Sequence, residues 1–166
     1  MPLQGLLTRH RSFQTMSPVE MIETALRLDP SRRVIATLHP KERYDREDRR
    51  ALKRLQAEHG RFRVDDRPPA VHLAHCAYVV TQNSSVAFEG FLFDRPAILF
   101  ARIDFHHIAL SLPHMSVEDA FACVATHRPP FADYVHWFWQ EQSINAGRPE
   151  AKDRIAARFR ALGWPV

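Results

Sequence analysis

The side chains best suited to chemistry lie in two short polar turns, each following an apolar run. His39-Pro40-Lys41 follows the run 33–38, and Gln82-Asn83-Ser84-Ser85 follows the run 78–81. An imidazole with a pKa near neutrality can donate a hydrogen bond to a phosphate or protonate a departing one. Hydroxyls and exposed N–H groups at the start of a helix also bind anions. Together the two turns predict a phosphate-binding site.

Each turn also has a purely structural interpretation. Asn83 or Ser84 can cap a helix that begins near Ser85, and such a cap needs no ligand. A loop carbonyl can satisfy His39, and Lys41 can belong to a solvated basic turn. Glu89, one turn into the helix, can meet a ligand hydroxyl or simply complement the helix dipole. The residues by themselves leave both interpretations open.

Two clusters have the composition of metal sites but not the spacing. Asp104 precedes the pair His106-His107, whose adjacent side chains point in different directions, and no HxH or HxxxH pattern supplies further ligands. Asp65-Asp66 could hold a divalent ion but is better explained as an exposed turn. We therefore expect no metal site.

The elements that must position the two turns alternate between strand and helix. Ser17-Pro18-Val19-Glu20 is typical of a helix start, and Gly60 is expected to end the next helix. Continuous apolar runs favour strands buried on both faces of a parallel sheet, which places the chain in the α/β class. Ligands bind beyond the carboxyl ends of such strands, where both turns lie. The predicted strands are 3–7, 33–38, 62–64, 78–81 and 97–101, and the predicted helices are 17–28, 45–59, 68–74 and 85–92.

The rest of the chain is predicted to be helical and to belong to the same domain. Residues 1–16 give a poorly defined start, and 116–166 form a helical C-terminal region with an aromatic-rich helix at 134–139. No internal repeat or linker interrupts the sequence, which favours one domain over 1–166. Three consecutive aromatic residues, Trp137, Phe138 and Trp139, cannot all lie on one face of a helix. One of them can therefore reach a neighbouring domain or subunit.

Composition excludes several classes of protein. The chain has 166 residues, 45% hydrophobic and 25% charged, with a formal net charge of +4. These values are ordinary for a globular protein, and the scattered arginines do not form the concentrated stripe of a nucleic-acid binder. The two isolated cysteines favour a reducing compartment. With no apolar run of about 20 residues, we expect a cytoplasmic protein.

The two turns resemble a pair of motifs in a known class of enzymes. His39-Pro40 and Ser84-Ser85 resemble the HP and SS motifs of bacterial GT-B glycosyltransferases that use CMP-activated sugars, among them CMP-Kdo-dependent capsule transferases and bacterial sialyltransferases. The run 82–100 is most similar to the capsule polysaccharide biosynthesis family. CDP-glycerol-dependent teichoic-acid polymerases have a similar serine pair. The resemblance covers about residues 17–107.

This resemblance implies a fold and a site. The fold is one half of a GT-B enzyme, a Rossmann-like three-layer domain with a parallel sheet and C-terminal helices. His39 is the implied catalytic residue, acting on the nucleotide phosphate, while the serine pair binds that phosphate and Glu89 meets the ribose. The implied nucleotide-binding residues are His39, Pro40, Lys41, Gln82, Asn83, Ser84, Ser85 and Glu89.

The resemblance also implies partners. The donor is a CMP-activated sugar such as CMP-Kdo, the acceptor is a glycan or glycolipid, and no cofactor or metal is expected. In these families an acceptor-binding domain precedes the donor-binding one, but here His39 comes too early to leave room for it. The chain is then expected to work with a separate acceptor domain or subunit, in the cytoplasm or at the inner face of the membrane. The alternative is a non-catalytic half-domain that binds a nucleotide or a partner.

Overall fold

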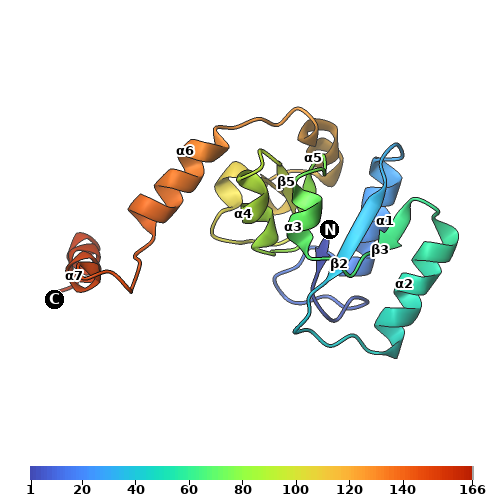
Figure 1. Cartoon of the computed structure of the whole chain (residues 1–166), viewed down its shortest axis with the longest axis horizontal. Helices are drawn as coiled ribbons and strands as arrows, with labels where there is room; N and C mark the ends of the chain where they lie inside the picture. The colour runs from blue at the N-terminus through green and yellow to red at the C-terminus, as the bar shows by residue number, and fades with distance from the viewer. Residues whose placement is uncertain (166) are drawn as a thin grey trace. The chain divides into compact units, whose positions relative to one another are not determined.

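The computed structural model describes residues 1–165, apart from the side chain of Pro113. The chain divides into two compact units, Met1–Pro129 and the segment from Pro130 onward. Figure 1 shows that the first unit contains all the labelled strands. The predicted α/β class is confirmed by the parallel sheets and helices of this unit. The prediction of one domain over 1–166 stays a prediction.

Six short strands form two parallel sheets in the first unit. The first sheet has the order β1-β2-β3 and the second the order β4-β5-β6, and every pair is parallel. All-parallel pairing is what the continuous apolar runs predicted. The strands are β1 (Pro2–Leu3), β2 (Val34–Leu38), β3 (Phe62–Val64), β4 (Val79–Thr81), β5 (Ala97–Leu99) and β6 (Leu110–Ser111).

Helices follow most of these strands, close to the predicted positions. The strand expected at 3–7 is instead β1, because the chain turns away at Leu6, which has a positive φ of 62°. β6 was not predicted, since two residues carry no periodic pattern. The helices of the first unit are α1 (Pro18–Leu28), α2 (Arg46–Glu58), α3 (Pro69–Leu73), α4 (Val86–Phe91) and α5 (Val117–Val124), with single 3₁₀ turns at His106–Ile108 and Leu112–His114.

Local capping fixes where α1 begins. Ser17 Oγ accepts a hydrogen bond from the Glu20 N–H, and the Glu20 carboxylate accepts one from the Ser17 N–H at 2.7 Å. This reciprocal pair confirms the predicted helix start. The helix ends where it was predicted to end, since α2 stops at Glu58 with His59 as its C-cap. The expected glycine cap is wrong, because Gly60 lacks a left-handed backbone.

A contact between β1 and β4 joins the two sheets. The Thr81 hydroxyl donates a hydrogen bond of 3.2 Å to the Pro2 carbonyl, and the two strands lie in contact. β1 therefore has β2 on one side and β4 on the other. The strands are parallel within each sheet, and the bond from Thr81 holds the last residue of β4 beside β1.

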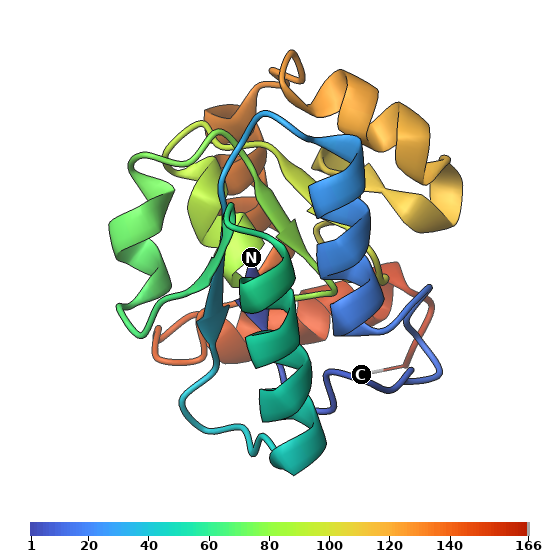
Figure 2. The ribbon, with the colours of Figure 1, turned by 90° about the vertical axis from the view of Figure 1, so that its right-hand side faces the viewer.

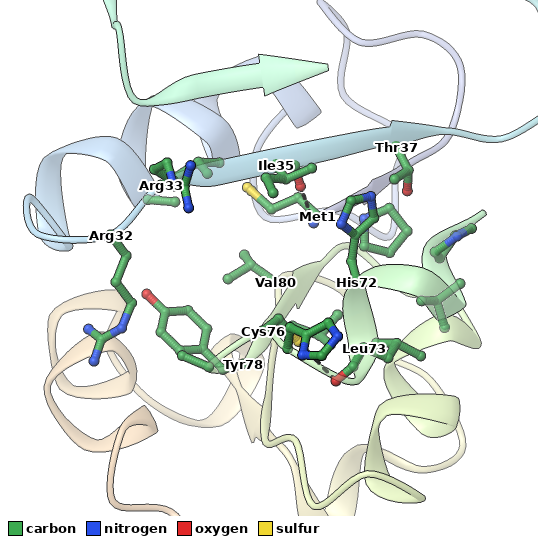
Figure 3. A pocket seen from close by; sticks show the side chains of 18 of the residues that line it. Met1, Arg32, Arg33, Ile35, Thr37, His72, Leu73, Cys76, Tyr78 and Val80 are labelled. Atoms are coloured by element: carbon green, nitrogen blue, oxygen red, sulfur yellow. Dashed lines mark hydrogen bonds between the residues drawn. The ribbon is translucent and has the colours of Figure 1, made fainter. Parts of the chain in front are cut away.

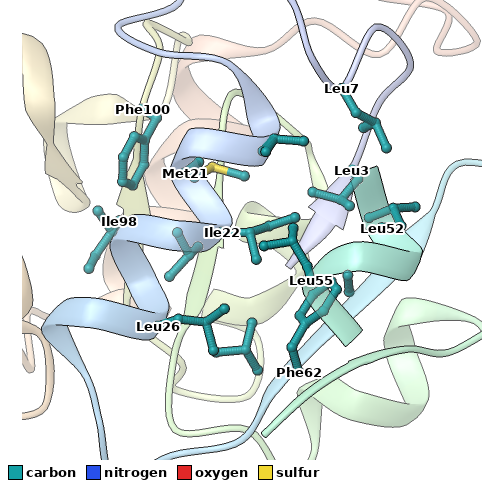
Figure 4. Close-up of a cluster of buried hydrophobic side chains, with 14 of the residues drawn as sticks. Leu3, Leu7, Met21, Ile22, Leu26, Leu52, Leu55, Phe62, Ile98 and Phe100 are labelled. Atoms are coloured by element: carbon teal, nitrogen blue, oxygen red, sulfur yellow. The ribbon is translucent and has the colours of Figure 1, made fainter. Parts of the chain in front are cut away.

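Both faces of the strands are covered. Val80 faces a core formed with α1, α2 and α5, whereas the adjacent Val79 faces α4, as alternation along a strand requires. A Cβ added to Gly90 of α4 would lie 3.2 Å from Val79 Cγ2, so glycine permits this close packing. Figure 2 shows α1 and α2 side by side, where Arg54 and Glu23 form an ion pair. Figure 4 shows the core side chains Leu3, Leu7, Met21, Ile22, Leu26, Leu52, Leu55, Phe62, Ile98 and Phe100.

The second unit is helical, as predicted. It contains α6 (Phe131–His136), a π-helical segment (Trp137–Gln142) and α7 (Ala151–Ala161). Arg154 of α7 donates a hydrogen bond of 2.7 Å to the Gln140 carbonyl, which ties the last helix to the π-helical segment. Within residues 1–165, no helix has both the length and the apolar character needed to cross a membrane.

Candidate nucleotide-binding edge

The two predicted turns follow strands that both contact β1. His39 directly follows β2 and Gln82 directly follows β4, with β1 between the two strands. Neighbouring strands are about 4.8 Å apart, so strands separated by one neighbour are about 10 Å apart. That separation is within the span of a nucleotide. The two turns are more than forty residues apart in sequence, and the strands that carry them both contact β1.

The turn after β4 contains two buried amide oxygens that lack a partner. Gln82 is 4% exposed, and its Nε2 donates a hydrogen bond of 2.9 Å to the Met16 carbonyl. In the described part of the chain, neither Gln82 Oε1 nor Asn83 Oδ1 has a hydrogen-bond partner. A buried acceptor left unpaired costs about 1–3 kcal/mol. Such a pair indicates a place for a donor from a ligand or from water.

The serine pair has a different role at each position. Ser84 Oγ accepts a hydrogen bond of 3.3 Å from the Val86 N–H, so the capping interpretation holds for Ser84. Ser85 is exposed, and its side chain caps nothing. Among residues 1–165, no acceptor pairs with the backbone N–H of Ser84 or Ser85. These N–H groups and the Ser85 hydroxyl remain available to an anion.

The turn after β2 holds His39 in a defined orientation. The His39 N–H donates hydrogen bonds to the Leu3 carbonyl (3.1 Å) and the Tyr44 hydroxyl (2.8 Å). The Lys41 N–H donates to His39 Nδ1 at 3.2 Å. With Nδ1 acting as acceptor, the neutral imidazole carries its proton on Nε2. The exposed ring is therefore a hydrogen-bond donor at this edge.

The loop after β1 packs tightly against the loop that carries His39. Gly5 lies so close to that loop that an added Cβ would be 2.7 Å from the Arg43 carbonyl and 2.8 Å from Glu42 Oε2. Further along, the N–H and hydroxyl of Thr15 both donate to the Phe100 carbonyl, at 3.1 and 2.8 Å. The loop thus crosses the ends of the strands. Sequence analysis missed it because it has no periodic pattern.

The start of α1 is closed to ligands. Many nucleotide-binding α/β folds place phosphate at their first helix. Here the Glu20 N–H is bonded to Ser17 Oγ, the Val19 N–H donates to the Leu7 carbonyl at 2.9 Å, and Pro18 has no N–H. Since these donors are already used, any phosphate at this edge is better served by the turn after β4.

The remaining edge residues differ in exposure. Pro40, Lys41 and Glu89 are exposed, so none of them is held in place by burial. Ser111, which sequence analysis did not select, is 4% exposed, and its Oγ has no hydrogen-bond partner among residues 1–165. The register of β4, β5 and β6 sets Ser111 level with Thr81. It is a third unpaired polar group near the carboxyl ends of the strands.

Two clusters were considered as metal ligands, the histidine pair His106-His107 and the acidic pair Asp65-Asp66. The expectation that His106 and His107 point in different directions is wrong, because their ring centroids lie 3.9 Å apart. His106 Nδ1 is hydrogen-bonded to the Ile103 carbonyl. Asp65 pairs with Arg67, whose hydrogen bonds lower the pKa of Asp65 to about 2. Over residues 1–165, no group of three or more His, Cys, Asp or Glu side chains is placed to bind a metal.

Comparison with known proteins adds no relative. No protein-family model, no curated protein and no solved structure matches this chain. The resemblance of the two turns to CMP-sugar transferases therefore depends on the motifs themselves. The physical case for a site depends on the polar groups at the edge.

Proposed function

We propose that the first unit binds a CMP-activated sugar at the carboxyl edge of its strands, as the donor-binding half of a capsule or surface-polysaccharide glycosyltransferase. The observation that carries the proposal is the turn Gln82–Ser85, where two buried amide oxygens lack donors beside N–H groups that lack acceptors. In a nucleotide, the phosphate oxygens would accept from these N–H groups, and the hydroxyl or amino groups would donate to the amide oxygens. We also propose that the first unit has a Rossmann-like three-layer fold.

The strand order supports this fold. The contact between Thr81 and Pro2 extends the two three-stranded sheets into the order 3-2-1-4-5-6. In doubly wound folds of this order, ligands bind in the crevice where the order reverses, which is between β1 and β4. The turn after β4 lies beside that crevice.

Each edge residue has a role in the proposed transfer. The N–H groups of Ser84 and Ser85 hold the nucleotide phosphate, and Nε2 of His39 donates to its oxygens. As the bond from the sugar carbon to the phosphate oxygen breaks, these donors stabilise the negative charge on departing CMP. The oxygen of an acceptor hydroxyl bonds to the same sugar carbon, and its proton passes to water. Gln82 and Asn83 accept hydrogen bonds from the nucleoside, and Lys41 and Glu89 border the site.

The proposal includes the partners of such an enzyme. The acceptor is a glycan or a glycolipid, bound by a separate domain or subunit. The proposed reaction takes place in the cytoplasm, at the inner face of the membrane when the acceptor is a lipid. The mild positive net charge of +4 is compatible with anionic ligands and with such a surface.

A second candidate function is nucleotide binding without catalysis. The hydrogen bond from the Lys41 N–H to His39 Nδ1 favours it. A general acid in the imidazolium form would protonate both ring nitrogens, and this bond would then have to break. A ring that only donates from Nε2 can bind a phosphate but is not arranged to protonate it.

Isothermal titration of the whole chain with CMP, CDP and UMP tests the proposal. We expect saturable binding of CMP and weaker binding of UMP. Ser85→Ala should weaken CMP binding by roughly 10- to 100-fold, the effect of losing one hydrogen bond to a charged group. Ser116→Ala is the matched control, because Ser116 Oγ caps α5 and its loss should lower stability without changing CMP affinity.

The same titration with His39→Ala tests the second turn. We expect at least tenfold weaker CMP binding, whereas His59→Ala, which precedes β3 at the opposite ends of the strands, should bind like the parent. CMP binding that survives both Ser85→Ala and His39→Ala would refute the phosphate site. If the chain binds CMP but neither hydrolyses a CMP-sugar nor transfers its sugar to added glycans or glycolipids, the non-catalytic function is favoured.

A further inference from the structure

A cavity of about 560 Å³ lies in the first unit, and its lining reaches Val86, the residue that follows the serine pair. Figure 3 shows that β1 and β2 supply one wall and α3 another, with Val80 at the back. None of the predicted nucleotide-binding residues lines it. The side chains that define it are Met1, Ile35, Thr37, Leu73, Cys76 and Tyr78.

The size and lining of this cavity are those of a site for a small molecule. Ligand pockets typically measure about 300–1,000 Å³ and are mostly apolar, with a few polar groups that orient the ligand. Here Ile35, Leu73 and Val80 contribute apolar surface. The cavity is large enough for a ligand with an apolar body of medium length.

The one carboxylate at the cavity is already neutralised. Asp29 accepts a hydrogen bond of 2.6 Å from the Tyr78 hydroxyl and forms an ion pair of 2.8 Å with Arg32. Burial raises the pKa of Asp29, but these bonds and one from Ser31 outweigh it and lower the pKa from 3.8 to about 2. Asp29 therefore does not present an unbalanced negative charge to a ligand.

The arginines leave an excess of positive charge. Arg32, Arg33 and Arg67 line the cavity, and Asp29 is the only acidic residue among its lining residues. Arg32 pairs with Asp29, and Arg67 pairs with Asp65. Arg33 is exposed and has no ion-pair partner among residues 1–165. Because Arg33 is exposed and lines the cavity, it borders the opening, and Figure 3 shows it beside β2 on the side of Met1.

The nearby histidines do not change this balance. His72 on α3 also lines the cavity, and its buried Nε2 lies 3.6 Å from Asp65 Oδ2 without a hydrogen bond. His75 is exposed at the far end of α3. Neither adds a negative charge, so the cavity favours an anionic group over a cationic one.

We propose that this cavity is a second binding site, which takes an apolar monocarboxylate, aliphatic or aromatic. The apolar body occupies the space between β2 and α3, and the carboxylate pairs with the Arg33 guanidinium at the opening. The two proposals rest on different residues, since none of the proposed nucleotide-binding residues lines the cavity, and they therefore fail independently.

Cys76 provides a direct readout of occupancy. It lines the cavity and is half-buried, and burial raises the pKa of its thiol. The other cysteine, Cys123, is exposed and is removed by Cys123→Ser. In that background, the rate of Cys76 alkylation by iodoacetamide is measured with increasing decanoate. We expect saturating decanoate to slow the reaction at least fivefold.

Matched probes and variants distinguish the contribution of the carboxylate to binding from that of the apolar chain. Decanol, which has the same chain without the carboxylate, should protect Cys76 only at much higher concentration. Arg33→Gln should raise the decanoate concentration needed for half protection at least fivefold, while Arg50→Gln on the exposed face of α2 should not change it. A circular-dichroism melt checks that each variant is folded.

The outcomes decide the proposal. Protection by decanoate that Arg33→Gln weakens supports it. Equal protection by decanol, equal protection in Arg33→Gln, or no protection by decanoate overturns it. Titration with CMP in saturating decanoate tests the nucleotide-binding edge separately. We expect the affinity for CMP to be unchanged.

Discussion

The Thr81 hydroxyl donates a hydrogen bond of 3.2 Å to the Pro2 carbonyl, across 79 residues of sequence. Thr81 is 1% exposed, so water does not compete for this bond. The contact sets β1 beside β4 and so joins two sheets that otherwise share no ladder. The nucleotide-binding site that we propose depends on this junction.

Replacing Thr81 with valine tests the junction. Thr81→Val keeps the shape of the side chain but leaves the Pro2 carbonyl without its donor, so we expect a loss of about 1–3 kcal/mol in the free energy of unfolding. Urea unfolding measures it. Thr126→Val is the control, since the Thr126 hydroxyl bonds to the Cys123 carbonyl on the exposed surface and its loss should cost less than about 0.5 kcal/mol. Equal stability of the two variants would contradict the assigned role.

Replacing Gly5 or Gly60 with alanine should have opposite effects on the stability of the protein. At Gly5 the added methyl group would meet the Arg43 carbonyl at 2.7 Å, so the loop that carries His39 must shift. We expect Gly5→Ala to lose about 1–3 kcal/mol of stability, as overpacking does. Gly60 has no atom within 4 Å of an added Cβ and no positive φ, so Gly60→Ala should be neutral or stabilising by about 0.4–1 kcal/mol. Thermal unfolding of the two variants side by side gives the answer.

Asp29 should make stability depend on pH in the acid range. Its pKa falls from 3.8 to about 2 on folding, so its contribution is complete above pH 4 and is lost as the pH falls towards 2. Its side chain is 11% exposed, and the shift corresponds to about 2 kcal/mol. Urea unfolding at pH 6 and pH 2.5 measures the loss. Asp66→Asn, at an exposed carboxylate, should leave the difference between the two pH values unchanged.

Tyr78→Phe should reduce that acid dependence. It removes the 2.6 Å hydrogen bond to Asp29, which is one of the interactions that lower the pKa of the carboxyl. We expect a loss of about 1.5–3 kcal/mol at neutral pH, the range for a hydrogen bond to a charged group, and a smaller further loss on acidification than in the parent. A parallel drop in both proteins between pH 6 and pH 2.5 would show that Tyr78 does not control Asp29.

A new charge in the turn after β4 should impair nucleotide binding. Asn83→Asp places a carboxylate beside the N–H groups proposed to hold the phosphate, and repulsion at this distance should weaken CMP binding roughly tenfold or more. The titration is compared with Asn145→Asp in the second unit, where Oδ1 accepts from the Gly147 N–H and no effect on CMP is expected. Undiminished CMP affinity in Asn83→Asp would remove this turn from the site.

The sequence determined features that depend on neighbours within a few residues. Ser17 and Glu20 form their capping box within one helical turn, so their spacing alone predicted the start of α1. The apolar runs predicted parallel strands, and the polar residues after them predicted that His39 and Ser84 follow strand ends. The error at Gly60 has the same local origin, because a glycine permits a left-handed turn without requiring it.

The tertiary structure decided what depends on residues far apart in the chain. Thr15 meets Phe100 across 85 positions, and Met16 accepts from Gln82 across 66, so no local pattern shows that the first loop crosses the strand ends. The unpaired oxygens of Gln82 and Asn83, and the cavity beside Arg33, arise only when several elements exclude water together. Local propensity acts over one turn or one strand, whereas burial and hydrogen-bond satisfaction are properties of the packed chain.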